Sequence, residues 1–261
     1  MRIHAPEIED ENWCPRVVRD GLTGFLQVTA ELLRVYDAAT PAIAGLLQRH
    51  RGSRVVDLCS GGGGPVVRLR GILARDHDVD VAVVLTDLFP NHAAFAAAAA
   101  RDPRIIGRVE PVDATDVPAE LDGVRTVING FHHLRPELAR RLVEDAARKR
   151  QPFISVEVVE RRWQTVLLLM GTPLLALLVS PLQRPLTASR LALTWLLPVI
   201  PFGVWWDGMC SCLRSYDVGE LEAVVDGLSD EHYAFRIERV PAGWLPLRLT
   251  MLIGEPTAPV V

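Results

Sequence analysis

The sequence is poor in lysine and has no excess of positive charge. The first shortage argues against a nicotinamide oxidoreductase, and the second argues against a nucleic-acid-binding protein. Lys149 is the only lysine, although Lys and Arg together number 28. No tyrosine lies four residues before it, which disfavours the Tyr-x-x-x-Lys pair of nicotinamide oxidoreductases. The formal net charge is −4, and such a chain is not expected to hold nucleic acid by bulk electrostatics.

Cysteine is also scarce, and its spacing forms no metal-binding motif. The 4 cysteines include no Cys-x-x-Cys pair, and Cys210 and Cys212 lack a second pair at the spacing of a zinc site. We therefore predict no metal centre and expect reduced thiols in a cytoplasmic protein. The first residues carry acids in place of an apolar core, so we expect no signal peptide.

The sequence does contain a predicted strand followed by a run of glycines. Residues 55–58 are mostly apolar and β-branched, which predicts a buried strand of a parallel sheet. Gly61 to Gly64 then remove every Cβ from the turn, so backbone can approach a ligand closely and adopt positive φ at low cost. Pro65 suits the first turn of a helix. This succession is typical of a nucleotide-binding α/β unit.

The order of these residues resembles motif I of the class I S-adenosylmethionine-dependent methyltransferases. Asp57 precedes the glycines, and the turn lacks the Gly-x-Gly-x-x-Gly spacing of dinucleotide binders. In that family the turn packs against a cofactor that has no pyrophosphate. Cys59 stands where the family most often has its first glycine, which leaves glycines 61 to 63 for the close approach. A glycine-rich loop of another α/β protein is the alternative.

Later strand ends continue the resemblance in the family's order. Residues 81–87 predict a second strand ending at Asp87, whose carboxylate could accept both hydroxyls of a ribose, or could instead cap a helix. A third strand over about 105–112 leads to Asp113, which resembles the family's adenine-binding corner and is favoured over Asp116. The resemblance implies cofactor contacts from the following residues: Asp57, Cys59, Ser60, Gly61, Gly62, Gly63, Asp87, Leu88, Asp113, Ala114 and Asn129.

Candidates for proton transfer follow the fourth and fifth predicted strands, 124–130 and 153–158. His132 or His133 could act as a general base in the crevice at the strand ends. Alternatively, one histidine caps the next helix and the other packs against the cofactor. Glu157 reaches the same crevice. The catalytic candidates are His132, His133, Glu157 and Asp207, and the sequence does not choose among them.

Residues 163–206 are unusually apolar for a connection between a strand and a helix. Their apolar segments, 163–179 and 191–206, are interrupted by glycine and proline, and neither reaches the roughly 20 uninterrupted residues of a spanning helix. We interpret the insertion as a helical lid over an oily substrate. The competing interpretation is a hairpin in a membrane surface, with Arg184 and Arg190 at the headgroups. Both interpretations can hold together.

The end of the insertion and the last strands complete the predicted architecture. Trp205 and Trp206 beside Asp207 suggest a substrate wall with one polar anchor, although buried aromatics usually only pack. Segments 233–240 and 245–254 read as an antiparallel hairpin. We therefore predict a single α/β domain: a Rossmann-like, doubly wound, seven-stranded sheet with an antiparallel last strand, N-terminal helices and an apolar helical lid. Its parts are a helical cap (1–50), a cofactor-binding core (51–160), the insertion (161–208) and a C-terminal helix and hairpin (209–261).

The resemblance implies an S-adenosylmethionine-dependent methyltransferase that acts on a small hydrophobic molecule. Two alternatives stay open. The same cofactor could support a non-methylating rearrangement or cyclisation, or the enzyme could modify lipids at a membrane surface through peripheral contact by residues 163–206. The acceptor atom and the oligomeric state cannot be read from the sequence.

Overall fold

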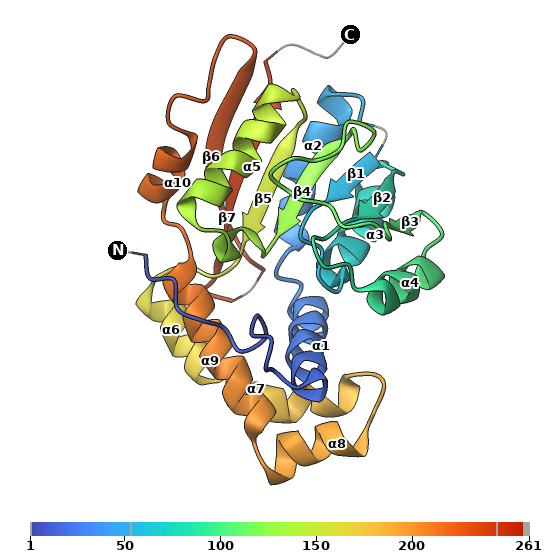
Figure 1. The fold of residues 1–261 in the computed structure, drawn as a ribbon, viewed down its shortest axis with the longest axis vertical. Coiled ribbons are helices and arrows are strands. Elements are labelled where there is room, and N and C mark those ends of the chain that lie inside the picture. Colours follow the sequence, from blue (N-terminus) through green and yellow to red (C-terminus); the bar gives the residue numbers. More distant parts are fainter. Residues whose placement is uncertain (1, 53, 244, 258–261) are drawn as a thin grey trace.

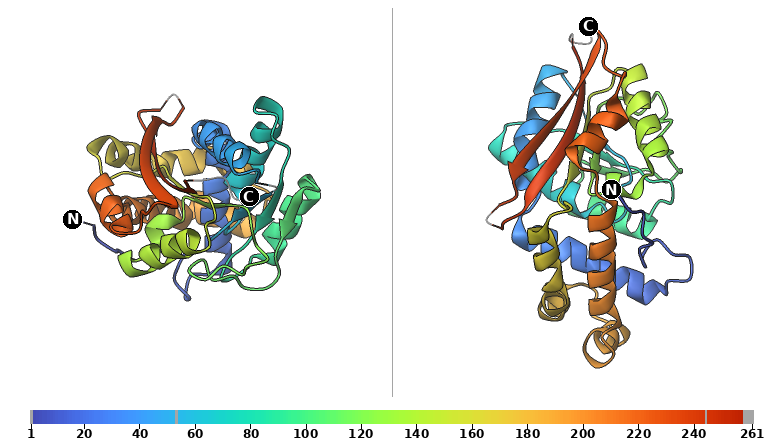
Figure 2. Two further views of the ribbon diagram at one scale, coloured as in Figure 1. Left: turned by 90° about the horizontal axis from the view of Figure 1, so that it is seen from above. Right: turned by 90° about the vertical axis from the view of Figure 1, so that its left-hand side faces the viewer.

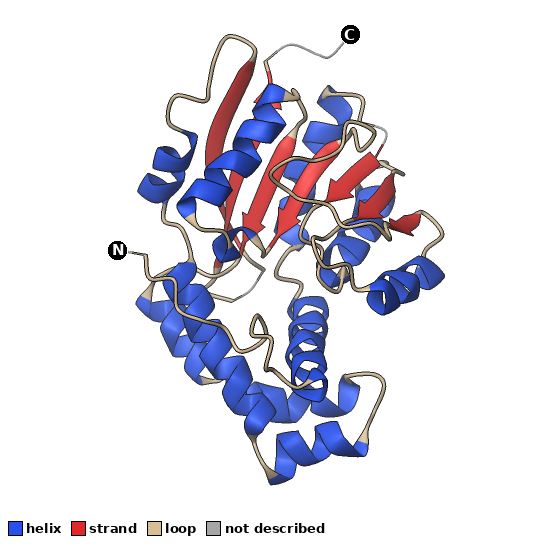
Figure 3. Ribbon diagram, in the orientation of Figure 1, coloured by secondary structure: helices blue, strands red, loops and turns tan. Residues whose placement is uncertain are grey.

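The computed structural model describes residues 2–52, 54–243 and 245–257, and its centre is a mixed sheet (Figures 1 and 3). The sheet has seven strands in the order β3-β2-β1-β4-β5-β7-β6. Strands β1 to β5 pair in parallel, whereas β7 is antiparallel to both β5 and β6. The strand bounds are β1 (Arg54–Asp57), β2 (Ala82–Leu85), β3 (Ile105–Gly107), β4 (Val124–Ile128), β5 (Phe153–Glu157), β6 (Tyr233–Pro241) and β7 (Arg248–Pro256). The predicted doubly wound sheet with its antiparallel final strand is confirmed.

Helices cover both faces of this sheet because the central strands are apolar on both sides. Val55 and Val56 are adjacent in β1, and one packs into each of two separate cores. The first core joins the sheet to α2 (Thr40–Arg49), α3 (Gly64–Asp76) and α4 (His92–Arg101). The second joins it to α5 (Pro136–Arg148) and α10 (Val218–Val225). The sheet is therefore a rigid platform for the loops at its ends.

A layer of helices lies beyond the carboxyl ends of the parallel strands (Figures 1 and 2). It consists of α1 (Arg16–Leu33), α6 (Trp163–Met170), α7 (Thr172–Val179), α8 (Ala188–Leu191) and α9 (Val199–Arg214). A third core holds the layer together, with Leu22 and Phe25 of α1 packed against α7 and α9. Pro173 lies in the first turn of α7 and Pro198 is the N-cap of α9, so each proline begins a helix.

Two predicted boundaries differ from the structure by five residues or more. The third strand ends at Gly107, well before the predicted residue 112. Beyond Gly107, the Arg108 N–H still donates to the Leu85 carbonyl and the Val112 N–H to the Asp87 carbonyl. Pro111 has no N–H, so a regular ladder cannot continue through it. The insertion does not end at residue 208, because α9 continues to Arg214. Gly208 lies inside α9, where a Cβ would be 2.8 Å from Leu169 Cδ2, so glycine here allows α6 to pack closely.

The helices of the insertion were compared with the length and hydropathy that a membrane-spanning helix needs. Among the described residues, no single helix is long and apolar enough to cross a bilayer. Two bent pairs meet the criteria by length and composition: α6 with Thr172–Leu182, bent by 45°, and Ala188–Leu196 with α9, bent by 74°.

Candidate active site

The glycine turn follows β1 directly and faces the helical layer. The Ser60 hydroxyl donates to the carbonyl of Asp57 at 2.9 Å, which closes the turn. Gly61 and Gly63 have φ values of 52° and 68°, in the left-handed region that favours glycine. A Cβ at Gly63 would lie 2.9 Å from Leu85 Cδ1. At Gly63, therefore, both the backbone conformation and the neighbouring strand require glycine.

Asp57 lies beneath this turn. Its side chain is buried and accepts a hydrogen bond from Thr126 Oγ1 at 2.5 Å. Burial raises the pKa of Asp57 to about 6, although the hydrogen bond from Thr126 opposes the shift. The contacts of this carboxylate are internal, so its observed role is to fix the turn relative to β4. Its predicted contact with a cofactor stays a prediction.

Asp87 follows β2 and connects the glycine turn to the next loop. Its carboxylate accepts hydrogen bonds from the backbone N–H of Gly61 and of Phe89, both at 2.9 Å. The alternative role as a helix cap is wrong, because the N-cap of α4 is Asn91, whose side chain accepts from the Ala94 N–H. Leu88, beside it, is exposed. Asp87 is thus at the rim of the turn.

Asp87 and Asp113 lie next to the glycine turn, because Asp87 accepts the Gly61 N–H and its carbonyl accepts the N–H of Val112, the residue before Asp113, at 2.9 Å. Burial, together with the charges of Asp87, Asp57 and Asp113, raises the pKa of the Cys59 thiol to about 12. Asp113 is exposed, and one of its oxygens accepts from both the backbone N–H and the hydroxyl of Thr115 at 2.8 Å. The adjacent Ala114 packs in the core. The predicted cofactor residues are therefore brought together at one edge of the sheet.

A buried histidine–carboxylate pair lies at the ends of β4 and β5. The short 3₁₀ helix η2 (Phe131–His133) follows β4, and His132 is fully buried in it. Its Nδ1 is 2.6 Å from Glu157 Oε2, while the other oxygen of Glu157 accepts the Phe131 N–H at 2.7 Å. A carboxylate partner favours a proton on Nδ1, which leaves the lone pair on Nε2. That Nε2 has no hydrogen-bond partner among the described residues.

The N-terminal arm, residues 2–14, closes over this pair. Glu7 is buried, and its Oε1 lies 3.9 Å from His132 Nε2. Ser211 Oγ donates to Glu7 at 3.0 Å, and Arg214 Nη1 is 3.3 Å away. Burial raises the pKa of Glu7 to about 7, against the opposing charges of His133 and Arg214. A proton on Glu7 is therefore gained or lost near neutral pH.

His133 lies nearer the surface than its neighbour and belongs to an ionic network. Its Nε2 is 3.6 Å from Glu7, and its Nδ1 is 3.2 Å from Asp10. Arg214 Nη1 donates to Asp10 at 2.7 Å. Glu7, His132 and His133 each offer a ligand atom within 4.8 Å of the others, a spacing that a metal ion could bridge. The guanidinium of Arg214 already supplies positive charge at this point.

The remaining predicted site residues have contacts that the sequence did not indicate, although Asp207 lies in the cavity wall as a catalytic candidate would. Neither histidine caps α5, whose N-cap residue is Arg135 with no side-chain cap. The Asp207 carboxylate accepts the backbone N–H groups of Ile8 at 2.6 Å and Glu9 at 3.2 Å, so it anchors the arm. Trp205 and Trp206 are not in the cavity wall: their indole N–H groups reach Met170 Sδ at 3.4 Å and the Pro6 carbonyl at 3.0 Å.

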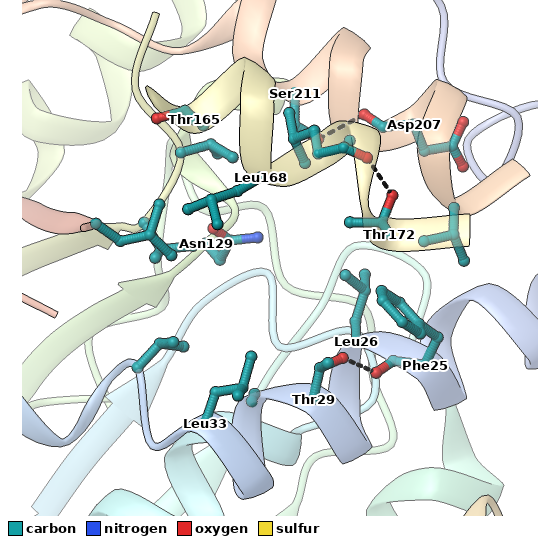
Figure 4. A pocket seen from close by; sticks show the side chains of 18 of the residues that line it. Phe25, Leu26, Thr29, Leu33, Asn129, Thr165, Leu168, Thr172, Asp207 and Ser211 are labelled. Atoms are coloured by element: carbon teal, nitrogen blue, oxygen red, sulfur yellow. Dashed lines mark hydrogen bonds between the residues drawn. The ribbon is translucent and has the colours of Figure 1, made fainter. Parts of the chain in front are cut away.

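A cavity of about 430 Å³ extends from the histidine pair into the helical layer (Figure 4). Asn129, in the left-handed conformation after β4, lines its inner end together with His132. Figure 4 shows the rest of the wall between α1 on one side and α6 and α9 on the other. The apolar wall residues from the helical layer include Leu22, Phe25, Leu26, Leu33, Leu168, Leu169, Leu175 and Val204, and Val158, Leu245 and Leu247 line the wall beside the sheet. Polar side chains of the arm and α9, namely Glu7, Asp207 and Ser211, also line the cavity, and most of the remaining wall is apolar.

We compared the sequence and the structure with known proteins. No family model matches the sequence, and no curated protein matches it in sequence. Solved structures do match. The plantazolicin methyltransferase BpumL, in complex with SAH, has a TM-score of 0.56 at 10% identity and covers 95% of this chain and 94% of its own. The O-methyltransferase NcsB1 from neocarzinostatin biosynthesis, in complex with S-adenosylmethionine and 2-hydroxy-5-methyl naphthoic acid, has a TM-score of 0.51 at 15% identity. This chain covers 58% of NcsB1, which covers 92% of this chain.

The chain has the methyltransferase fold. Four polar residues around the histidine pair were not predicted from the sequence, and none of them lies at a strand end. Glu7 and Asp10 come from the arm, and Ser211 and Arg214 come from the last turns of α9. The dense acids of residues 7–11 were the available signal. Ser211 and Arg214 could not be identified as partners of these acids, because the insertion was expected to end at residue 208.

Proposed function

We propose that the protein is an S-adenosylmethionine-dependent methyltransferase that methylates a small hydrophobic molecule. The observation that carries this proposal is the cavity, which reaches the carboxyl ends of β4 and β5 at Asn129, His132 and Val158. A Cβ at the neighbouring Gly130 would be 3.5 Å from Cys59 Cβ, so this end of the cavity adjoins the glycine turn. In open α/β sheets, ligands bind outside the carboxyl ends of the strands. The methyltransferase fold and the strand-end aspartates support the cofactor, and the apolar wall supports the substrate class.

The glycine turn and its neighbours fit the cofactor. A Cβ at Gly61 would meet no atom within 4 Å, so the surface there is open to a ligand. Asn129 Oδ1 is buried and has no hydrogen-bond partner among the described residues, and it could accept from the cofactor's ammonium group. Asp87 and Asp113 are the candidates for the ribose hydroxyls and the adenine amine. When bound, S-adenosylmethionine supplies an electrophilic methyl group on a sulfonium.

We assign His132 as the general base. Glu157 holds its imidazole through Nδ1, so Nε2 is free to accept a proton from a hydroxyl or amine in the cavity. The hydroxyl or amine that gives its proton to His132 would thereby become the nucleophile toward the methyl group that bound S-adenosylmethionine would supply. The walls formed by α1, α6 and α9 hold the acceptor in line, and such positioning supplies much of the acceleration in a displacement of this kind.

The cofactor assignment is tested by binding and by product mass. We expect calorimetry to detect binding of S-adenosylhomocysteine and none of NADH. The protein should also transfer a labelled methyl group to a component of a hydrophobic metabolite extract, giving a product heavier by one methyl group. A product with unchanged elemental composition would support rearrangement or cyclisation instead. Binding of NADH alone would refute the proposal.

The base is tested by substitution of His132. We expect His132→Ala to lower turnover roughly a hundredfold or more without weakening cofactor binding. Glu157→Gln should also lower turnover, because the imidazole loses the carboxylate that orients it. His232→Ala is the matched control, since His232 is exposed and remote from the cavity. If His132→Ala turns over at the wild-type rate, His132 is not the general base, and the catalysis rests on positioning of the reactants alone.

We further propose a cytoplasmic location and no nucleic-acid partner. The net charge of −4 supports the second point, since nucleic-acid affinity depends on neutralising phosphates.

A further inference from the structure

The outer face of the insertion carries a continuous stripe of exposed apolar side chains. The stripe follows α6 and α7 at helical spacing. Its members and their exposed fractions are Trp163 71%, Leu167 64%, Met170 59%, Leu174 64%, Leu178 63% and Leu182 55%. Isolated exposed apolar residues are normal on a protein surface, whereas a contiguous patch of this kind marks an interaction site.

A second group of exposed apolar residues adjoins this stripe. It covers the tip between α8 and α9 and one side of α9, with Trp195, Leu196, Leu197, Val199, Phe202 and Trp206. Trp205 Nε1 lies 3.4 Å from Met170 Sδ, and its ring is 5.6 Å from that of Phe202, so α6 and α9 join the two groups. Together these residues form what we call the apolar tip. Figures 1 and 2 show these helices at the end of the molecule opposite the C-terminus.

The inner faces of the same helices are occupied. Ala176 and Val179 of α7, and Ile200 and Val204 of α9, pack in the third core against α1. The insertion is therefore apolar on both sides, and only its inner side is covered by the protein. The inner contacts hold these helices beside the cavity, so an external partner would meet the outer face alone.

The charge pattern selects the kind of partner. Between residues 163 and 206 the only charged residues are Arg184 and Arg190. The sequence-based expectation that both contact headgroups is wrong for Arg190, which is buried and donates to the Gln183 carbonyl at 2.7 Å. Arg184 is exposed. An apolar surface with tryptophans, no acid and an exposed cation matches the interfacial region of a lipid bilayer. A protein interface would be expected to have a polar rim with hydrogen-bonding groups.

We propose that the apolar tip inserts into the interfacial region of a lipid bilayer, so that the protein is a peripheral membrane protein. This inference rests on the outer face and does not depend on methyl transfer. Its consequence for the proposed function is that the apolar part of the cavity, walled by Leu168, Leu169 and Leu175 of the same helices, lies close to the lipid. A lipid-soluble acceptor is the substrate class that fits this arrangement.

Vesicle sedimentation of the whole protein tests the proposal. We expect the wild-type chain to sediment with phosphatidylcholine vesicles and with vesicles that also contain phosphatidylglycerol, and to remain bound at high salt. The double variant Leu174→Glu/Leu178→Glu should bind at least tenfold more weakly, because each side chain is largely exposed and its transfer to lipid is lost. Val109→Glu is the control, since Val109 is 66% exposed outside the apolar tip.

A second variant and two further measurements make the outcomes distinct. Trp195→Ser should also weaken binding, and circular dichroism should show native helix content in every variant. Wild-type protein that stays in the supernatant with both vesicle types overturns the proposal. A dimer that the double variant dissociates would assign the face to a second copy. Binding that requires anionic lipid and disappears at high salt would also overturn it, since Arg184 alone would explain that result. Binding of S-adenosylhomocysteine, measured separately, reports on the proposed function.

Discussion

Glu7 makes the stability of the protein depend on pH in a way that one substitution isolates. This carboxyl is buried, and its pKa is raised from the ordinary 4.5 to about 7. In the unfolded chain it loses its proton near pH 4.5, whereas in the folded chain it keeps the proton up to about pH 7. Between these values the native state binds more protons than the unfolded state, so the free energy of unfolding falls as the pH rises.

The size of this fall follows from the two pKa values. One pKa unit corresponds to about 1.4 kcal/mol, so Glu7 contributes a loss of up to about 3 kcal/mol between pH 5 and pH 8. Glu7→Gln keeps the shape and the acceptor for the Ser211 hydroxyl but does not titrate. We therefore expect the variant to be about as stable as the wild type at pH 5 and more stable than it at pH 8.

Urea unfolding at intervals between pH 5 and pH 8 measures the difference directly. Glu9 and Asp57 also have raised pKa values, of about 7 and about 6, and they titrate in both proteins, so their effect cancels in the comparison. Glu222→Gln is the control, because Glu222 is exposed on α10 and should leave the slope unchanged. Parallel pH profiles for wild type and Glu7→Gln would contradict the reasoning.

Two further predictions concern the glycine turn. Asp87→Ala should weaken S-adenosylhomocysteine binding by about 1–3 kcal/mol in calorimetry, because a charged acceptor is lost, whereas Asp116→Ala should not; equal affinities would exclude Asp87 from the cofactor site. Gly63→Ala should destabilise the protein by about 1–3 kcal/mol in urea unfolding, since its φ of 68° and its closeness to Leu85 both oppose a side chain. The control is Gly71→Ala in α3, where a Cβ meets nothing within 4 Å, and this change should stabilise the protein by about 0.5–1 kcal/mol. If Gly63→Ala and Gly71→Ala destabilise the protein equally, the argument from backbone conformation is refuted.

The sheet could be predicted because its signals are local. Each central strand is a short β-branched run, and the acids Asp57 and Asp87 mark the strand ends at which the chain turns. The order of these segments is enough to place their ends on one edge, since parallel strands with right-handed connections leave few topologies. The cavity's inner end, at Asn129 and His132, was predictable for the same reason.

The other half of the site could not be predicted because its contacts are between distant segments. Glu7 and Arg214 lie more than 200 positions apart, and no periodicity relates the arm to α9. The hydropathy of Trp205 and Trp206 suggested a substrate wall, but hydropathy does not distinguish the inner side of a helix from the outer when both sides are apolar. Helix rotation, which only packing determines, assigned Val204 to the cavity and the tryptophans to the outside.

The arm joins the apolar tip to the inner end of the cavity. The Pro6 carbonyl accepts from Trp206, the Asp207 carboxylate accepts the Ile8 N–H, and Arg214 donates to the Ala5 carbonyl at 2.6 Å, so the arm is attached along the second half of α9. His132, in contrast, is fixed to the sheet through β4 and β5. The arm is also attached beside His132, because Arg2 donates to the His132 carbonyl at 2.7 Å and Glu7 Oε1 lies 3.9 Å from His132 Nε2. The arm is therefore a continuous connection between the outer helices and the end of β4, where His132 lies.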